Sequence, residues 1–267
     1  MTFKLIAADL DGTLRAEQQS FTPRLRDAVR RAQARGVRVV IATGRIYRTA
    51  APFARDLGLT DAIICDHGAT IRDVGSGEIL FEKKVPLDLA RELIERASDD
   101  LTVIVCVEEE FYTPRISADA QTFVGNYRDH LHVVPDLARS LRGEPQKILF
   151  INDELVSASL LVELKIRFGG LLQVVQSFPL YVELTHREAS KGNAVAWLAK
   201  RWNIAREQVI ALGDQGNDCS MIEWAGLGVA MGNAIDSVKA LADFVAPCAE
   251  EDGAAAVIEK FVLESGE

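Results

Sequence analysis

Four aspartates stand where two short apolar runs of the sequence end. One pair follows the run Leu5–Ala8 and the other pair follows the run Val209–Leu212. The four residues are Asp9, Asp11, Asp214 and Asp218. In an open parallel sheet, ligands bind beyond the carboxyl ends of the strands, so these acids are expected to share one edge. Like charges 4 Å apart repel by about 4 kcal/mol at an effective dielectric constant near 20, so such a cluster needs a cation.

A divalent metal ion and a lysine would supply that charge. Oxygen-only ligands suit Mg²⁺, which proteins hold through one or two carboxylates, waters and a phosphate oxygen. Lys191 opens a helical pattern just before the strand that leads to Asp214, so its ammonium can reach the same edge. Thr43 and the backbone N–H groups near Gly44 follow another apolar run and can donate to phosphate oxygens. The pattern predicts a pocket for a phosphoryl group.

Two carboxyl groups at such a place can divide a phosphoester hydrolysis into two steps. A carboxylate beside a metal ion and a phosphate is a competent nucleophile that forms an aspartyl-phosphate. A second carboxyl group, two residues away, can protonate the leaving alkoxide and then activate water. Splitting the reaction matters because the required rate acceleration approaches ~10²¹ for phosphate monoesters.

The elements that must position these residues alternate between strand and helix patterns. Strand-like runs at Leu5–Ala8, Val37–Ala42 and Ala62–Cys65 are separated by helical patterns at Arg24–Ala34 and Tyr47–Leu57. This alternation predicts a parallel sheet with right-handed crossovers, an α/β fold. From about residue 84 to residue 186 short strands and helices mix instead, and the alternation returns after Ser190. We therefore expect a second, α+β domain inserted in the first.

Composition limits the possible classes of protein. The 267 residues include 30 Lys+Arg and 39 Asp+Glu, a net charge of −9, and 48% are hydrophobic. These values exclude a disordered chain, a collagen-like fibre and a coiled coil. Apolar runs of four or five residues are far short of the ~20 that span a membrane, and the first residues lack a signal-peptide layout. The negative charge disfavours nucleic acid and anionic membranes as partners.

Cysteine and histidine spacing points to a cytoplasmic protein without zinc. The four cysteines are scattered and indicate reduced thiols, most of them in the core: Cys65, Cys106, Cys219 and Cys248. The four histidines show no zinc-binding spacing. We expect a small phosphorylated metabolite as partner, and a monomer or a small homo-oligomer.

Four ordered motifs resemble the haloacid dehalogenase superfamily, and in particular its Cof-like phosphatase branch. They read DLDGTL from residue 9, ATGR from residue 42, SKG from residue 190 and GDQGNDCSM from residue 213. The insertion between the second and third motifs is similar to the α/β cap of that branch. The resemblance implies a Rossmann-like core formed by residues 1–83 and 187–267, with a cap domain formed by residues 84–186.

The resemblance also implies a role for each matching residue. Asp9 would be the nucleophile and Asp11 the general acid and base, with Thr43 and Lys191 holding the phosphoryl group. The Mg²⁺ ligands would be Asp9, the main-chain carbonyl of Asp11, Asp214 and, directly or through water, Asp218. Substrate or phosphate contacts would come from Gly44, Arg45, His67, Lys191 and Asn217.

One position departs from the family pattern. After the third strand the family usually has Asn-Gly-Ala, whereas this chain has His67 before Gly68 and Ala69. His67 is either a substrate or phosphate contact or a tolerated substitution on a loop. Because of this departure, the substrate of a close family member cannot be transferred to this chain from the resemblance alone.

The sequence therefore predicts a Mg²⁺-dependent phosphatase acting on a small soluble phosphomonoester, such as a sugar phosphate or a nucleotide or cofactor phosphate. A phosphosugar mutase with the same motifs is the nearest alternative. A receiver-type signalling module is disfavoured because such modules are about half this length, and a catalytically silent scaffold is disfavoured by the intact set of acids and lysine.

Overall fold

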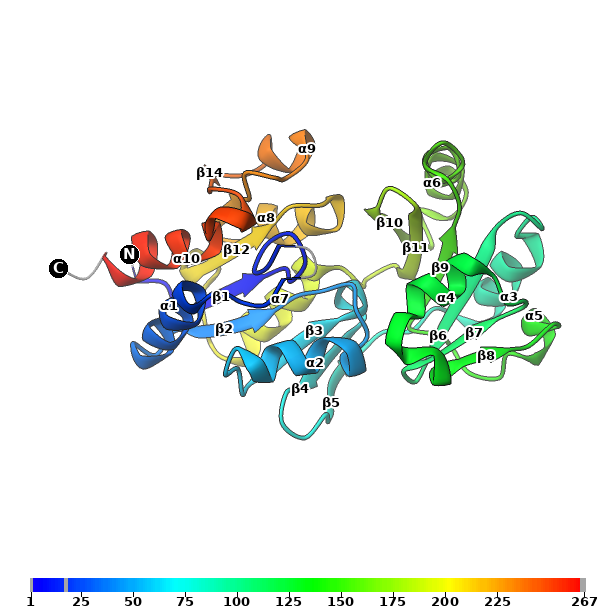
Figure 1. The fold of residues 1–267 in the computed structure, drawn as a ribbon, viewed down its shortest axis with the longest axis horizontal. Coiled ribbons are helices and arrows are strands. Elements are labelled where there is room, and N and C mark those ends of the chain that lie inside the picture. The colour runs from blue at the N-terminus through cyan, green and yellow to red at the C-terminus, as the bar shows by residue number, and fades with distance from the viewer. Residues whose placement is uncertain (1, 17–18, 265–267) are drawn as a thin grey trace. The chain divides into compact units, whose positions relative to one another are not determined.

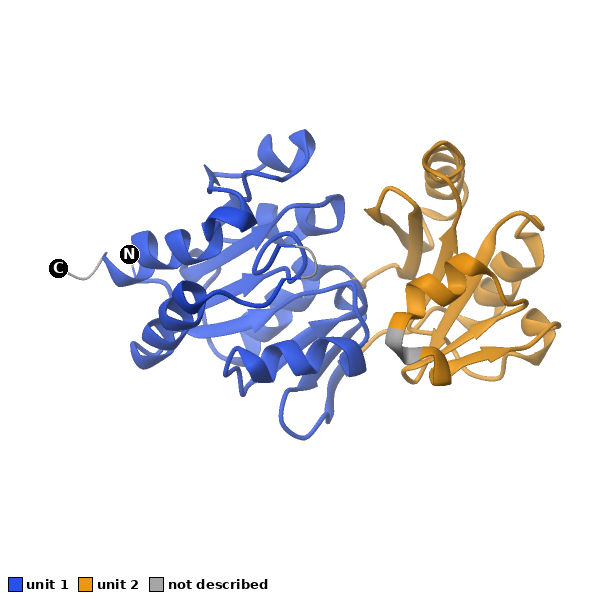
Figure 2. Ribbon diagram, in the orientation of Figure 1, with its two compact units in different colours: residues 1–81, 190–267 blue, residues 82–189 orange. Residues whose placement is uncertain are grey.

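The chain folds into two compact units. A computed structural model describes residues 2–16 and 19–264. The core unit contains residues 1–81 and 190–267, and the inserted unit contains residues 82–189 (Figure 2). The insertion expected from the sequence, residues 84–186, falls inside the inserted unit.

A parallel sheet forms the centre of the core unit (Figure 1). Its strands lie in the order β14-β13-β12-β1-β2. Their bounds are β1 Leu5–Ala8, β2 Arg38–Ile41, β12 Val209–Gly213, β13 Leu227–Ala230 and β14 Phe244–Val245. A parallel bridge between Ala42 and Ile64 places β3 (Ala62–Cys65) beside the end of β2. β3 continues into a small sheet with β4 (Thr70–Asp73) and β5 (Ile79–Glu82). The predicted α/β class with a parallel core is confirmed.

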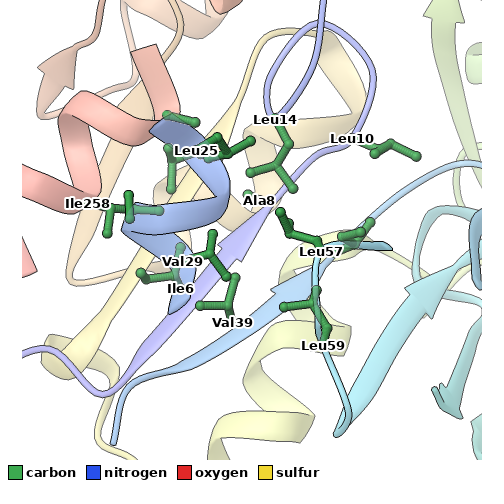
Figure 3. Close-up of a cluster of buried hydrophobic side chains, with 14 of the residues drawn as sticks. Ile6, Ala8, Leu10, Leu14, Leu25, Val29, Val39, Leu57, Leu59 and Ile258 are labelled. Atoms are coloured by element: carbon green, nitrogen blue, oxygen red, sulfur yellow. The ribbon is translucent and has the colours of Figure 1, made fainter. Parts of the chain in front are cut away.

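Helices cover both faces of this sheet because its strands are apolar on both sides. The helices are α1 Pro23–Ala34, α2 Tyr47–Asp56, α7 Lys191–Arg201, α8 Cys219–Trp224, α9 Asp236–Lys239 and α10 Gly253–Ile258. Alternate residues of a strand point to opposite faces. Ile6 and Val39 pack with α1 and α10 in the cluster of Figure 3, whereas Leu5 and Val40 pack with α7 on the other face. Both faces of the sheet are thereby buried, as is usual for a parallel sheet.

Local signals in the sequence fix where α1 begins and ends. The Thr22 hydroxyl accepts a hydrogen bond from the N–H of Leu25 at 3.1 Å, and Pro23 occupies the first helical position. Gly36, with a φ of +79°, follows the helix and takes the left-handed conformation that glycine tolerates best. The helix ends at Ala34, as the sequence pattern predicts, and begins one residue before the predicted start at Arg24.

The inserted unit is an α+β layer built on a six-stranded sheet. The strand order is β10-β11-β9-β6-β7-β8; β7 and β8 pair in parallel, and the other neighbouring strands pair antiparallel. The strands are β6 Thr102–Val107, β7 Glu110–Thr113, β8 Leu131–Val133, β9 Lys147–Ile151, β10 Leu172–Phe178 and β11 Tyr181–His186. The helices are α3 Leu87–Arg96, α4 Ala118–Val124, α5 Leu137–Ser140 and α6 Glu154–Phe168. Among the described residues, no helix has the length and apolar character that crossing a bilayer requires.

An ion pair is buried in the inserted unit. Lys147 Nζ on β9 lies 2.8 Å from Glu183 Oε1 on β11, and both side chains are almost fully buried. The Ser177 hydroxyl donates to the other carboxylate oxygen of Glu183. Removing one member of a buried pair leaves the other charge uncompensated, whereas replacing both with apolar groups is often nearly neutral.

We therefore predict a strongly non-additive pair of substitutions. Lys147→Met should lower the free energy of unfolding by about 3–5 kcal/mol. The double variant Lys147→Met/Glu183→Leu should recover most of that loss, because neither member of the pair is then left as an uncompensated buried charge. Urea unfolding of the full chain measures both, and additive losses would contradict a coupled pair.

Candidate active site

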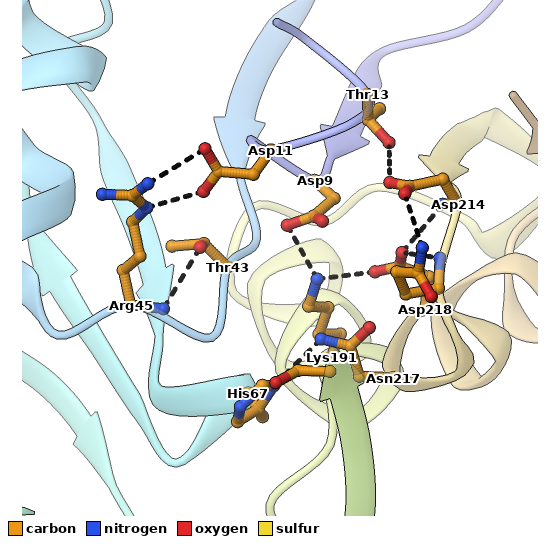
Figure 4. Close-up of polar contacts among 12 residues, drawn as sticks. Asp9, Asp11, Thr13, Thr43, Arg45, His67, Lys191, Asp214, Asn217 and Asp218 are labelled. Carbon is orange, nitrogen blue, oxygen red and sulfur yellow. Dashed lines mark hydrogen bonds and ion pairs between the residues drawn. The ribbon is translucent and has the colours of Figure 1, made fainter. Parts of the chain in front are cut away.

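The strand ends bring the predicted residues to one place. In the register of the sheet, Ala8 of β1 pairs with Leu212 of β12 on one side and Ile41 of β2 on the other. The N–H of Asp9 donates to the carbonyl of Leu212 at 3.0 Å, so the chain leaves β1 directly beside β12. Figure 4 shows the side chains of Asp9, Thr43 and Asp214 gathered beyond these strands.

The loop after β1 needs a glycine. Gly12 has a φ of +83°, and a Cβ atom there would lie 2.4 Å from Asp214 Oδ2. The loop can therefore approach Asp214 this closely only without a side chain. The amide of Asn233 donates to the carbonyl of Gly12 at 2.8 Å and accepts from the N–H of Ala249 at 3.0 Å. Asn233 thus ties the loop to the segment after β13.

Lys191 is fully buried at the first turn of α7. Ser190 caps the helix by accepting from the N–H of Asn193 at 3.1 Å. The ammonium of Lys191 donates to Asp9 Oδ1 at 2.8 Å and to Asp218 Oδ1 at 2.5 Å (Figure 4). Burial by itself would lower the pKa of Lys191, but the charges of Asp218 and Asp9 outweigh it and raise that pKa above its ordinary value. The lysine is a fixed cation.

Asp218 uses both carboxylate oxygens within the protein. Its Oδ1 accepts from Lys191, and its Oδ2 accepts from the backbone N–H groups of Asp214 and Gln215, each at 2.9 Å. Asp214 accepts from the hydroxyl of Thr13 at 2.8 Å. The other oxygen of Asp214 accepts from the side-chain amide of Gln215 at 3.2 Å. Ligand atoms of Asp9, Asp214 and Asp218 lie within 4.8 Å of one another. Asp218 is thus engaged by three donors and Asp214 by two, while Lys191 donates to Oδ1 of Asp9, so Asp9 and Asp214 keep more acceptor capacity for a metal ion than Asp218 does.

The electrostatics of this cluster favour an added divalent cation. Burial, together with the charges of Asp218 and Asp214, raises the pKa of Asp9 well above its usual value, although Lys191 opposes the shift. Burial and the charge of Asp218 raise the pKa of Asp214 to about 6. Three carboxylates and one ammonium leave two negative charges uncompensated when all are ionised. An all-oxygen donor set with this charge fits Mg²⁺.

Asp11 faces away from the acidic cluster. Arg45 donates from Nε to Asp11 Oδ2 at 2.6 Å and from a terminal nitrogen to Oδ1 at 3.0 Å (Figure 4). Arg15 Nε lies 3.1 Å from Oδ1. The carboxylate of Asp11 is therefore no part of the cluster. Its main-chain carbonyl as a metal ligand stays a prediction.

A left-handed turn after β3 contacts the loop at Thr43. The turn is η1 (Asp66–Gly68), and both Asp66 and His67 have positive φ angles, 50° and 57°. The N–H of His67 donates to the carbonyl of Thr43 at 3.1 Å, and the N–H of Asp66 donates to that of Arg45 at 3.0 Å. Histidine and aspartate are among the few non-glycine residues enriched in this conformation.

His67 links two of the predicted motifs. Its ring lies against Gly44, where an added Cβ would be 2.2 Å from the ring carbon Cε1. Nδ1 of the ring lies 3.1 Å from Nδ2 of Asn217. The amide oxygen of Asn217 is buried and has no hydrogen-bond partner within the described parts of the chain. Gly44 therefore makes room for the histidine, and Asn217 offers a polar atom for a ligand.

Sequence reasoning found most of these residues but missed three that support them. The Thr13 hydroxyl donates to Asp214, and the Asn233 amide donates to the Gly12 carbonyl. Arg15 forms an ion pair with Asp11. Asn233 follows the end of β13, so the strand-end argument applied to that strand would have found it. Thr13 and Arg15 lie in the first loop, but nothing in their spacing shows which acid each contacts.

The burial of Lys191 predicts a pH-dependent loss of stability when it is replaced. In Lys191→Met, Asp9 and Asp218 lose their cation, which should lower the free energy of unfolding by about 3–5 kcal/mol near pH 8. A buried acid with a raised pKa binds more protons in the folded state than in the unfolded state, so stability falls as pH rises. Loss of the ammonium raises the pKa of Asp9 further.

The defect should therefore be smaller at pH 5 than at pH 8, as measured by urea unfolding without added metal. Lys200→Met, on the exposed side of the same helix, is the matched control and should change stability little. Equal losses in the two variants would refute the role given to Lys191.

Comparison with known proteins identifies the family. A model of haloacid dehalogenase-like hydrolases matches residues 6–258. The chain is 32% identical to the 5-amino-6-(5-phospho-D-ribitylamino)uracil phosphatase YcsE of Bacillus subtilis, over 97% of this chain and 96% of that protein. It is 31% identical to the pyridoxal phosphate phosphatase YbhA of Escherichia coli, over 92% of this chain and 93% of that protein.

A solved structure agrees with these sequence matches. A haloacid dehalogenase-like hydrolase from Bacteroides thetaiotaomicron superposes with a TM-score of 0.83 at 31% identity, over 97% of this chain and 99% of that one. The resemblance drawn from the four motifs is thus confirmed. The chain belongs to the haloacid dehalogenase-like hydrolases and is a phosphatase.

Proposed function

We propose that this phosphatase is Mg²⁺-dependent and hydrolyses a small phosphomonoester through an aspartyl-phosphate on Asp9. The observation that carries the proposal is the setting of the Asp9 carboxylate. It is buried, one of its oxygens is bonded to Lys191, and Asp214 stands beside it. A carboxylate oriented by a fixed cation and placed next to a metal-binding acid is equipped for attack on phosphorus.

In the first step the second carboxylate oxygen of Asp9 attacks phosphorus, and the bond from phosphorus to the ester oxygen breaks. The third N–H of Lys191 and the hydroxyl of Thr43 donate to phosphoryl oxygens. Asp11 gives a proton to the departing alkoxide. Since Arg45 and Arg15 hold Asp11 in this structure, its carboxyl group must leave them when substrate arrives.

In the second step water replaces Asp9 on phosphorus. Asp11, now ionised, takes a proton from the water as it attacks, and the bond from phosphorus to the Asp9 oxygen breaks. Phosphate leaves, and Asp9 is regenerated. A bound Mg²⁺, held by Asp9, Asp214 and the Asp11 carbonyl and supported by Asp218, would neutralise charge on the phosphoryl oxygens.

The proposed substrate is a small metabolite. The two phosphatase relatives are named for a phosphorylated ribitylaminouracil and for pyridoxal phosphate, which are both small molecules. For this chain we propose the same class, a sugar phosphate or a nucleotide or cofactor phosphate, in a cytoplasmic setting. Gly44, Arg45, His67 and Asn217 would contact it. The buried amide oxygen of Asn217 supports a polar contact at this place.

Two matched substitutions separate the proposed roles of the first two acids. Asp9→Asn should abolish turnover of an aryl phosphate, with a loss of at least about 10⁴-fold, because no nucleophile remains. Asp11→Asn should still release one equivalent of the aryl alcohol in a burst, and then turn over slowly because water is no longer activated. Asp27→Asn, at an exposed position of α1, is the control. Substantial steady-state activity of Asp9→Asn would eliminate the proposed nucleophile.

The products distinguish hydrolysis from the mutase alternative. With a hexose 1-phosphate as substrate, a phosphatase releases inorganic phosphate in proportion to substrate lost. Formation of the 6-phosphate isomer without phosphate release would instead favour a mutase.

Metal binding should be strongest above the pKa of Asp214. Below a pH of about 6 the proton on Asp214 competes with the metal ion, because ligands must be deprotonated. At a free Mg²⁺ concentration of about 100 times Kd the metal should add about 2.7 kcal/mol to stability. Thermal unfolding of the EDTA-treated chain should show a larger Mg²⁺-induced rise in Tm at pH 8 than at pH 5, and Asp214→Asn should remove most of it. If Mg²⁺ does not raise the Tm of the wild type, or raises the Tm of Asp214→Asn by the same amount, this metal site is excluded.

A further inference from the structure

Helix α6 (Glu154–Phe168) packs only one of its faces into the inserted unit. Its inner residues contact the buried cluster of that unit: Val156, Leu160, Leu161, Leu164 and Phe168. The helix lies over β10 and β11 at one end of the six-stranded sheet (Figure 1). The opposite face of α6 is exposed.

The exposed face of α6 is unusually apolar. Leu155 and Ile166 are each 83% exposed and Val162 is 58% exposed, and no other large hydrophobic side chain in residues 2–16, 19–125 and 128–264 exceeds these values. At 100° per residue these three side chains and Ser159 fall within one narrow stripe along the helix. Single exposed apolar residues are ordinary, but an ordered stripe of them indicates a surface that another molecule covers.

The charges of α6 lie beside this stripe. On the helical wheel, Glu154 and Lys165 lie on one side, and Glu163 and Arg167 on the other. Glu154 is at the first turn and Lys165 is in the last, so this side of the helix is acidic at its start and basic near its end. Two acids and two bases give the helix no excess positive charge, and the chain carries −9 overall. Both facts disfavour an anionic lipid surface.

A second, antiparallel copy of α6 matches both the stripe and the charges. In that arrangement Leu155 faces Ile166 of the second copy, and Ser159 faces Val162. The same register brings Glu154 beside Lys165 of the second copy, and two-fold symmetry repeats each contact. A parallel two-fold arrangement would instead place Glu154 and Lys165 of the two copies on opposite sides of the helix pair, so Glu154 would lose this partner.

We propose that the outer face of α6 is a homodimer interface formed by two antiparallel helices. The occupant is therefore a second copy of this chain. A 15-residue helix is about 22 Å long, so this interface is small and the dimer should dissociate on dilution. The interface is built entirely from the inserted unit and does not depend on the proposed reaction.

Sedimentation velocity over a range of protein concentrations tests the interface. The wild-type chain should pass from monomer to dimer within the micromolar range. Ile166→Glu should raise the dissociation constant by about 100-fold or more, because each dimer contains the substitution twice. Ile116→Glu, at a 53% exposed position outside α6, is the matched control and should dimerise like the wild type. A monomer at all concentrations, or an unchanged dimer of Ile166→Glu, would overturn the proposal.

A charge exchange tests the antiparallel register. Glu154→Lys and Lys165→Glu should each weaken the dimer, because each single change places like charges together. The double variant Glu154→Lys/Lys165→Glu should restore dimerisation to near the wild-type level. Failure of the double variant to recover would overturn the antiparallel register. Flotation of a monomeric wild type with vesicles of phosphatidylcholine and phosphatidylserine would show that lipid covers the stripe instead, and would also overturn the proposal.

Discussion

The ammonium of Lys191 lies between the carboxylates of Asp9 and Asp218, and the rest of the site depends on this contact. Three buried acids at the end of one sheet repel one another in a medium of low dielectric constant, and the ammonium offsets that repulsion. The lysine lies on α7 and the acids follow β1 and β12, so the contact also joins the two sequence segments of the core unit. Fold and chemistry therefore use the same interaction.

Lys191 neutralises only part of the negative charge of the acidic cluster. One lysine leaves the cluster with an excess of negative charge, and burial raises the pKa of both Asp9 and Asp214. A buried site that retains uncompensated charge is costly in the free protein, and that cost is offset when a cation binds. Asp218 accepts hydrogen bonds from Lys191 and from two backbone N–H groups, more donors than engage either Asp9 or Asp214, so those two acids keep more acceptor capacity for a ligand.

Apolar runs predicted the strands of the core, and the residues that follow those runs predicted most of the site. The bounds of β1 and β3 agree with those expected, because uninterrupted apolar runs define them. The short elements β7, β8 and α5 were not expected, since three or four residues carry no readable period. The orientation of Asp11 was equally unreadable, because its arginine partners act through side-chain geometry. The strained turn at His67 depends on contacts with Thr43 and Asn217 that no local pattern encodes.

The central claim is that phosphorus becomes bonded to Asp9 during turnover. An aspartyl-phosphate trapped by rapid quenching can be reduced with borohydride, which converts that aspartate to homoserine. Peptide mass spectrometry of the Asp11→Asn variant, quenched during turnover of an aryl phosphate, should locate homoserine at position 9 and at none of the other site aspartates. Homoserine at another aspartate, or its absence while the aryl alcohol is released in a burst, would contradict the account.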